Sequence, residues 1–168
     1  MYPIIFLDID GVLNCQVFYE MEALRTGNAI RRGGHDMCKE RISWLNDLCN
    51  ETGAKVVISS SWRIGRSVEE LREIFESFGS TFSIIDKTGS SANRGTEIYQ
   101  WLDKNTMTLF GVHNYDYYNY AIIDDDSDML LLQQENFFHV DNYAGLTPNT
   151  CYKIKRFFKK YECPVASC

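Results

Sequence analysis

The stretch IIFLDIDGVLN, residues 4–14, carries the strongest structural signal in the chain. Its first four residues form an apolar run, the pattern of a strand that is buried on both faces of a parallel sheet. Asp8 and Asp10 follow with one residue between them, and Gly11 comes next. Carboxylates cost free energy when they are gathered at the mouth of a hydrophobic core. The stretch therefore predicts either a polar turn or a group of side chains that does chemistry.

The length and composition of the chain favour one globular domain. It has 168 residues, of which 45% are hydrophobic, enough for one well-buried core and short for two. The formal net charge of −6 argues against a surface that coats nucleic acid, although it leaves room for a local basic patch. The apolar runs are far shorter than the roughly 20 residues that span a bilayer. We expect a single domain over residues 1–168 without a membrane partner, with a monomer favoured over an oligomer.

The start of the chain and its cysteines favour a cytoplasmic protein. Met1 leads directly into the first strand, without the basic and apolar regions of a secretory signal. The six cysteines have no CxxC spacing, so reduced thiols are expected in preference to disulfides. The three histidines do not have the spacing of metal ligands, which argues against a zinc site.

Apolar runs of strand length alternate with amphipathic stretches along the chain, the pattern of a parallel sheet covered by helices. We expect strands at 3–8, 54–58, 82–85, 120–124 and 137–140. We expect helices at 36–53, 67–79, 94–105 and 147–161. Residues 14–35 and 106–119 fit neither pattern and are expected to be loops or small hairpins. The predicted fold class is α/β, a three-layer, Rossmann-like parallel sheet flanked by helices.

Polar residues cluster at the carboxyl ends of the predicted strands. Asp8 and Asp10 follow the first strand. The run SSSWR at 59–63 follows the second strand, and DDDSD at 124–128 follows the fourth. In open parallel sheets the ligand lies outside these ends, at a switch point in strand order. We therefore expect these residues to meet in space.

The carboxylates of this group imply a bound cation. They are Asp8, Asp10, Asp124, Asp125, Asp126 and Asp128. Like charges at close range cannot all stay ionised without compensation, and a hard divalent cation is the usual source of it. Magnesium (Mg²⁺) fits best, because it keeps positions open for water and a phosphate oxygen.

Two further residues suit an incoming phosphoryl group. Ser59 supplies a hydroxyl donor, and Arg94, at the start of a predicted helix, supplies a fixed positive charge. The sequence has neither a GxxxxGK nor a GxGxxG loop. The phosphate is therefore expected on a substrate under attack, not on a nucleotide cofactor.

Four motifs carry a resemblance to a known superfamily. They are LDIDGVLN, VVISSSWR, Arg94 at a helix start, and AIIDDDSD, in that order. Over about residues 4–128 they resemble the four motifs of the haloacid dehalogenase (HAD) superfamily of phosphatases. The resemblance implies a HAD-like fold and a magnesium-dependent hydrolysis of phosphomonoesters through a phosphoaspartyl intermediate.

The resemblance also implies roles for individual residues. Asp8 would be the nucleophile that attacks phosphorus. Asp10 would protonate the leaving oxygen and then take a proton from the attacking water. Ser59 and Arg94 would hold the phosphoryl oxygens, and Gly11 fits the tight bend that follows the first aspartate.

Magnesium would be bound by Asp8, by the backbone carbonyl of Asp10, and by Asp124 or Asp125, with Asp128 in support. Three assignments stay open at this point. Ser60 is an alternative to Ser59 within the three consecutive serines. Lys87, at the end of the third predicted strand, is an alternative to Arg94. The extra aspartate of the fourth motif leaves the choice between Asp124 and Asp125 open.

The gaps between the motifs leave little room for a cap domain. After one helix and one strand, about 20 residues remain between the first two motifs, so we expect a flap or small insertion at 14–35 and an open site. Among capless relatives, SSSWR and RGTEIYQWL are most similar to phosphatase modules of nucleic-acid end repair, akin to the 3′-phosphatase part of polynucleotide kinases. The predicted partner is thus a phosphorylated substrate, such as a 3′ or 5′ nucleic-acid end or a nucleotide.

Other functions compete with this interpretation. Small phosphometabolites or phosphoproteins are alternative substrates. A phospho-receiver domain of two-component signalling is also a small α/β protein with clustered aspartates, but the DID spacing favours turnover. Residues 124–135 match several ligand positions of an EF-hand loop, although a strand precedes them.

Several aromatic and basic residues are candidates for substrate contacts. The run NYDYYNY at 114–120 is either a surface on which bases stack or part of the core. Trp62 and Arg63 follow the second motif, where Arg63 would support the site. They would either meet the substrate or pack in the core.

Overall fold

The computed structural model describes residues 1–28, 36–113, 117 and 119–160. Within them, five parallel strands form one sheet in the order β3-β2-β1-β4-β5. The strands are β1 (Ile4–Leu7), β2 (Lys55–Ile58), β3 (Ile84–Lys87), β4 (Tyr120–Asp124) and β5 (Phe137–His139). The expected strands are confirmed, with β3 displaced by two residues from the predicted 82–85. Phe82 comes before the strand and packs on Phe75 instead.

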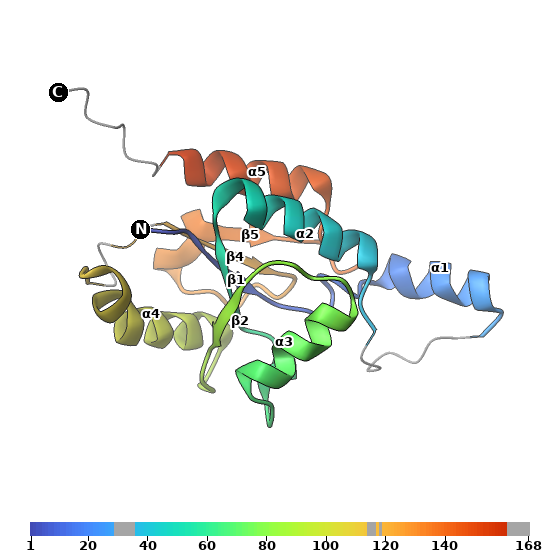
Figure 1. The fold of residues 1–168 in the computed structure, drawn as a ribbon, viewed down its shortest axis with the longest axis horizontal. Coiled ribbons are helices and arrows are strands. Elements are labelled where there is room, and N and C mark those ends of the chain that lie inside the picture. Colours follow the sequence, from blue (N-terminus) through green and yellow to red (C-terminus); the bar gives the residue numbers. More distant parts are fainter. Residues whose placement is uncertain (29–35, 114–116, 118, 161–168) are drawn as a thin grey trace.

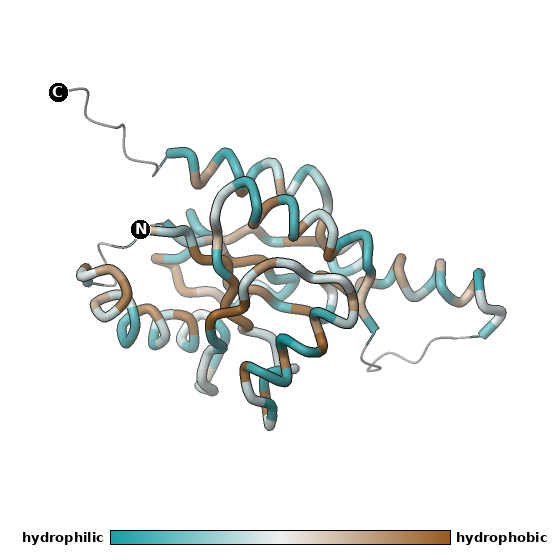
Figure 2. The backbone as a smooth tube through the Cα atoms, viewed as in Figure 1, coloured by the Kyte–Doolittle hydropathy of each residue, from teal (hydrophilic) through white to brown (hydrophobic). Residues whose placement is uncertain are grey.

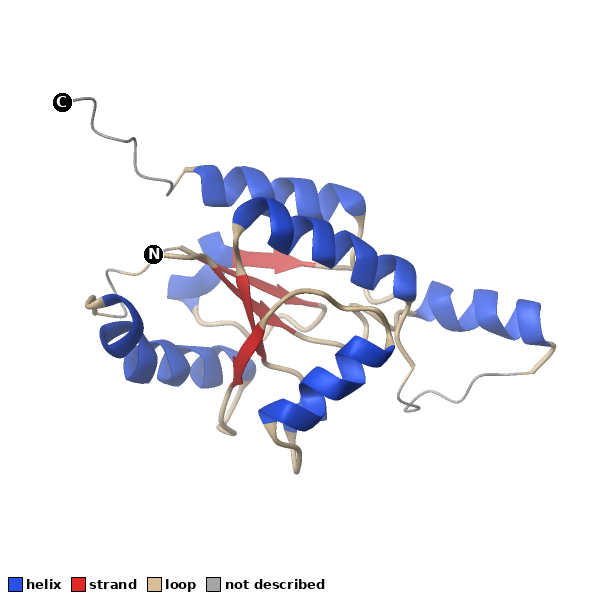
Figure 3. Cartoon of the chain, in the orientation of Figure 1, coloured by secondary structure: helices blue, strands red, loops and turns tan. Residues whose placement is uncertain are grey.

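Helices cover both faces of the sheet, so the predicted three-layer α/β fold is confirmed (Figures 1 and 3). They are α1 (Gln16–Thr26), α2 (Lys39–Thr52), α3 (Val68–Ser77), α4 (Arg94–Phe110) and α5 (Pro148–Lys159). Two short 3₁₀ helices, η1 (Ser61–Arg63) and η3 (Leu131–Asn136), follow β2 and β4.

Alternate residues of the central strands pack into two hydrophobic clusters. Ile5 and Leu7 of β1 face α2, α3 and α5, whereas Ile4 and Phe6 face α4. The interior of the central strands is therefore apolar on both faces, as Figure 2 shows for the centre of the molecule, because a parallel sheet with helices on both sides has no wet face.

Residues 16–26 form a helix, so the prediction of a loop or hairpin over the whole of 14–35 is wrong for this part. Helix α1 buries none of its residues and extends away from the body of the protein (Figure 1). It has no strong apolar face to mark it in the sequence, and local contacts such as the Glu22–Arg25 ion pair support it instead. It ends at Gly27, which adopts the left-handed conformation. The remainder of the expected flap, 29–35, lies outside the described residues.

Helix α4 continues five residues beyond the predicted 94–105. Thr106 is buried and donates its hydroxyl to the carbonyl of Leu102, and Phe110 packs against Tyr2 and Tyr117. The burial of Thr106 and the ring contacts of Phe110 offset the weak helix propensity of the two threonines in this part of the helix.

Two smaller findings concern membranes and thiols. No helix among the described residues is both long and apolar enough to cross a bilayer. The cysteines in the described part of the chain, Cys15, Cys38, Cys49 and Cys151, form no disulfide, as expected.

Candidate functional site

The register of the sheet brings the polar strand ends together. Leu7 is the partner of Ile58 in β2 and of Ile123 in β4. The next residue of each strand, Asp8, Ser59 and Asp124, therefore lies at the same edge of the sheet. The strand order reverses at β1, so this edge is the switch point at which open α/β sheets bind ligands.

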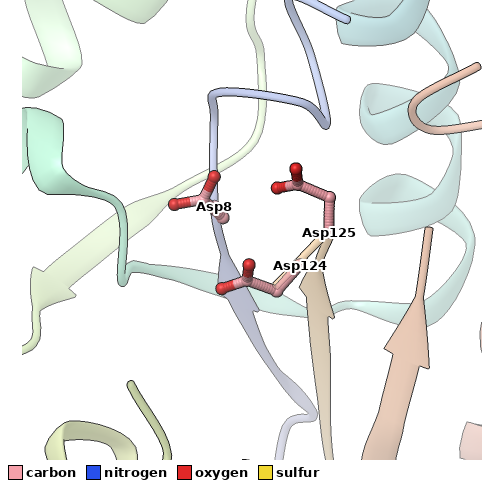
Figure 4. Close-up of side chains that lie close together, drawn as sticks. All are labelled: Asp8, Asp124 and Asp125. Carbon is pink, nitrogen blue, oxygen red and sulfur yellow. The ribbon is translucent and has the colours of Figure 1, made fainter. Parts of the chain in front are cut away.

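Three carboxylates converge at this edge (Figure 4). Asp8, Asp124 and Asp125 each place one oxygen within 4.8 Å of the others. Asp8 and Asp124 are buried, and Asp125 is half-buried. The predicted meeting of the first and fourth motifs is therefore observed, and both members of the 124/125 pair belong to the cluster.

Burial makes these carboxyls reluctant to ionise. It raises the pKa of Asp124 to about 6 and also raises the pKa of Asp125. The pKa of Asp8 is raised well above its usual value, mainly by burial and then by the charge of Asp124. Three hard oxygen ligands that resist ionisation without a cation fit a divalent ion such as magnesium.

Among the described residues, Arg94 is the basic side chain that forms ion pairs with this cluster. Its Nη2 donates to Asp8 Oδ1 at 3.0 Å and its Nε donates to Asp124 Oδ2 at 3.0 Å. The alternative, Lys87, instead donates its ammonium group to the backbone carbonyls of Arg63 and Arg66. The geometry therefore favours Arg94 as the positive charge of the site.

Arg94 is held from two sides. The Asp128 carboxylate accepts from the Arg94 backbone N–H at 3.0 Å, which fixes the first turn of α4. Glu97, one turn along α4, lies 3.6 Å from Arg94 Nη1. Asp128 thus holds the backbone of Arg94 and is not one of the three clustered carboxylates.

The three serines after β2 have different environments. Ser59 is fully buried next to β1, where its N–H donates to the Leu7 carbonyl, and its Oγ has no hydrogen-bond partner among the described residues. Ser60 is equally buried, but its Oγ accepts from the N–H of Trp62. Ser61 is exposed and lines the cavity of the site. Ser59 is thus the serine whose buried hydroxyl oxygen has no partner among the described residues.

Arg63 is a structural residue, so the idea that it meets the substrate is wrong. Its guanidinium is buried, donates to the carbonyls of Ser59 and Ser60, and pairs with Glu97 at 2.7 Å. The guanidinium also donates hydrogen bonds to the backbone carbonyls of Thr88 and Gly89. Arg63 therefore holds the serine loop in place.

The side chain of Asp10 is held by two residues for which the sequence offered no such role. Asn14 Nδ2 donates to one carboxylate oxygen at 2.7 Å, and Trp62 Nε1 donates to the other at 3.0 Å. Asn14 Oδ1 also accepts from the Gly11 N–H. Asp10 thus has a fixed orientation at the edge of the cluster. Nothing in a single sequence connects Asn14 or Trp62 with Asp10.

Gly11 is required by space and by backbone conformation. Its φ is +75°, and a Cβ at this position would lie 2.2 Å from a carboxylate oxygen of Asp125. A larger residue would displace a member of the carboxylate cluster. The predicted tight bend after the first aspartates is thus present, and it makes room for the fourth motif.

Two other sequence interpretations can be compared with the structure. Of the run at 114–120, Tyr117 and Tyr120 belong to the core, the second of the two alternatives, whereas 114–116 and 118 lie outside the described residues. The acidic run at 124–128 follows a strand and precedes a 3₁₀ helix, so the EF-hand interpretation does not hold.

An open cavity of about 590 Å³ lies over the site. Asp8, Asp10, Arg94 and Asp125 line one part of it. The first turn of α1 and the segment after β5 line the other part. The reactive groups are thus accessible to a ligand of substantial size.

The raised pKa of Asp124 predicts a pH-dependent stability in metal-free buffer. The folded state binds this proton more tightly than the unfolded state does. The resulting stability is complete below pH about 4 and is lost as the pH rises through about 6. Asp124→Asn removes the titration, so the free energy of unfolding of the variant, relative to wild type, should increase from pH 4 to pH 7.

Urea unfolding at several pH values with a chelator present measures this difference. Asp103→Asn, which changes an exposed carboxylate on α4, is the matched control and should show a flat difference. A flat or falling difference for Asp124→Asn would contradict the environment described for this carboxyl.

Comparison with known proteins adds one finding. A family described as "HAD domain in Swiss Army Knife RNA repair proteins" matches residues 4–151. Searches of the curated proteins and of the solved structures found no match. The matched range contains each of the four motifs and the residues of the site.

Proposed function

Because the chain belongs to the family of HAD domains in Swiss Army Knife RNA repair proteins, we propose that it is a magnesium-dependent phosphatase acting on a phosphorylated nucleic-acid end. One observation carries the proposal. The Asp8 carboxylate lies against Arg94 and two further carboxylates in an open cavity, and Asp10 is fixed beside it.

The proposed reaction has two steps. Asp8 attacks phosphorus to form an aspartyl phosphate, and Asp10 gives a proton to the oxygen of the alcohol that leaves. A water molecule then attacks the phosphorus of the aspartyl phosphate, and Asp10 takes a proton from this water. The bond between phosphorus and the Asp8 oxygen breaks, which releases inorganic phosphate and the free Asp8 carboxylate. The hydrogen bonds from Asn14 and Trp62 keep Asp10 in place for both proton transfers.

Ser59 and Arg94 would bind the phosphoryl oxygens as negative charge develops on them. The unpaired hydroxyl of Ser59 supports this assignment, since a buried polar atom without a partner is uncommon. Magnesium bound by Asp8, Asp124 and Asp125 would supply the positive charge that keeps these carboxyls ionised and neutralises the phosphate.

We expect the purified protein to hydrolyse an aryl phosphate in magnesium buffer and to lose this activity in EDTA. Excess magnesium should restore it, because the carboxylate cluster needs a cation to stay ionised and bind phosphate. Activity that survives full chelation would contradict the metal assignment.

The substrate class needs its own measurement. Oligonucleotides with 3′ or 5′ phosphates are compared with mononucleotides, sugar phosphates and phosphopeptides, by kcat/KM. A clear preference for an oligonucleotide end supports the proposal. A preference for a sugar phosphate or a phosphopeptide would replace the nucleic-acid end by that substrate.

A further inference from the structure

The cavity extends beyond the reactive groups to a wall that the four motifs do not include. This wall consists of Gln16 and Tyr19 from the first turns of α1, and Asn142 and Tyr143 from the segment after β5. A cavity of about 590 Å³ is much larger than a phosphate group needs. The wall therefore faces the remainder of the substrate.

Backbone hydrogen bonds join the two halves of the wall. The N–H of Gln16 donates to the Asn142 carbonyl at 3.1 Å, and the N–H of Val17 donates to the Tyr143 carbonyl at 3.0 Å. The N–H of Tyr143 is itself bound by the Asp141 side chain at 2.7 Å. The backbone of Tyr143 is thus held on both sides, so the wall is formed before any ligand binds.

The wall combines two aromatic side chains, Tyr19 and Tyr143, with two neutral amide side chains. Glu20 accepts from the Tyr143 hydroxyl at 3.1 Å and from Gln16 Nε2 at 2.8 Å, which links the two halves again. Tyr143 remains 52% exposed, so its ring is open to a ligand. The other amide atom of Gln16, Oε1, has no hydrogen-bond partner among the described residues and remains an unsatisfied acceptor.

The charged side chains that line the cavity limit the chemical class of ligand that can bind at the wall. Among the described residues that line the cavity, Arg94 is the sole basic side chain, and it contacts Asp8 and Asp124. A second phosphate on the substrate would find no cation at the wall. The wall suits a flat, neutral group with hydrogen-bond donors, which describes a nucleobase.

The position of Asp10 indicates in which direction the alcohol part of the substrate extends from the phosphate. A group that protonates the leaving oxygen lies on the side of the alcohol that leaves. Asn14, which binds Asp10, comes two residues before Gln16, and all three line the same cavity. The alcohol portion of the substrate is thus directed from Asp10 towards the wall.

We propose that Tyr19 and Tyr143 form the subsite for the nucleoside that carries the phosphomonoester, an inference that rests on the phosphatase proposed above. The base stacks on these rings, and Gln16 and Asn142 bind its polar edge or its sugar. The subsite selects a nucleotide end over a sugar phosphate of the same charge.

Calorimetric titration with phosphonates, in which carbon replaces the ester oxygen, tests binding without turnover. The probes are methylphosphonate and nucleoside phosphonates substituted at the 3′ or the 5′ position. Wild type should bind one nucleoside phosphonate at least about tenfold more tightly than methylphosphonate. The binding ratio is the affinity for this nucleoside phosphonate divided by the affinity for methylphosphonate. Tyr143→Ala and Tyr19→Ala should each reduce the binding ratio by about fivefold or more, the usual effect of one stacked ring.

Two further variants sharpen the test. Tyr143→Phe keeps the ring and loses only the hydroxyl bond to Glu20, so it should retain most of the ratio. Tyr152→Ala removes an equally exposed tyrosine from α5, outside the cavity, and should leave the ratio unchanged. A wild-type ratio near one, or a ratio that neither Tyr19→Ala nor Tyr143→Ala changes, would overturn the subsite.

Hydrolysis of acetyl phosphate, which has no base, separates this inference from the proposed function. If acetyl phosphate is hydrolysed while the binding ratio is near one, the subsite is wrong and the phosphatase stands. If the ratio is high and tyrosine-dependent while no phosphomonoester is hydrolysed, the nucleoside subsite is supported and the proposed reaction is wrong.

Discussion

Asp8→Asn is expected to abolish turnover, with a fall in kcat of at least about 10⁴-fold. The amide cannot attack phosphorus, and the neighbouring carboxylates of the site are held in other roles. Asp124 is bound by Arg94 and by the N–H of Asp126, and Asp10 is bound by Asn14 and Trp62. Initial rates with the best substrate of the screen measure the loss, and acid quenching of wild type measures the aspartyl phosphate.

The controls for Asp8→Asn concern folding and residual carboxylate. Urea unfolding shows whether the variant is folded. We expect it to fold, because the substitution removes a carboxyl whose burial disfavours its charged form and raises its pKa. Asp8→Ala excludes activity from an asparagine that has deamidated. Asp103→Asn on α4 should keep wild-type rates. Substantial turnover in Asp8→Ala would show that another group is the nucleophile.

Asp10→Asn is the second large effect, with an expected fall in kcat of about 10⁴-fold or more. General acid–base catalysis by one group contributes about 10²–10⁴-fold, and Asp10 would act in both steps. The amide introduced by Asp10→Asn keeps one oxygen that can accept from Asn14 or Trp62 and loses the other of these two hydrogen bonds, so urea unfolding of the variant is measured beside kcat. A substrate with a good leaving group, such as an aryl phosphate, should recover part of the loss, because it needs no proton in the first step.

A positioning variant accompanies Asp10→Asn. Trp62→Phe keeps an aromatic ring and removes the 3.0 Å hydrogen bond to Asp10, so it should lower kcat by far less, and a good leaving group should recover part of that loss. A purely structural role would lower stability and give a loss that is equal for good and poor leaving groups. An Asp10→Asn loss that is equal for good and poor leaving groups would contradict the role of Asp10 as general acid.

Much of the fold could be predicted because its signals are local. A run such as residues 4–7 must be buried on both sides, and the glycine at 53 ends α2 as expected. The capping box of Ser67 and Glu70 starts α3 at the predicted residue. Helix α1 escaped prediction because it buries no residue, so no apolar period marks it.

The candidate site also has one part that the sequence could predict and one part that it could not. The order of its motifs along the chain indicated that Asp8, a serine of 59–61 and the aspartates at 124 and 125 meet, since parallel strands place their carboxyl ends at one edge. The sequence could not choose between Arg94 and Lys87, because that choice depends on which side chain reaches the carboxylates.

The tyrosines show this limit most clearly. Tyr117 and Tyr120 have the sequence pattern of a stacking surface, yet both are buried in the core, whereas Tyr19 and Tyr143 had no pattern and line the cavity. Local sequence determined the strands, most of the helices and the chemistry at the strand ends, because periodicity and capping act within a few residues. Only the tertiary structure decided which distant side chains share a cavity, because hydrogen bonds between segments far apart in the chain, such as α1 and the segment after β5, bring them together.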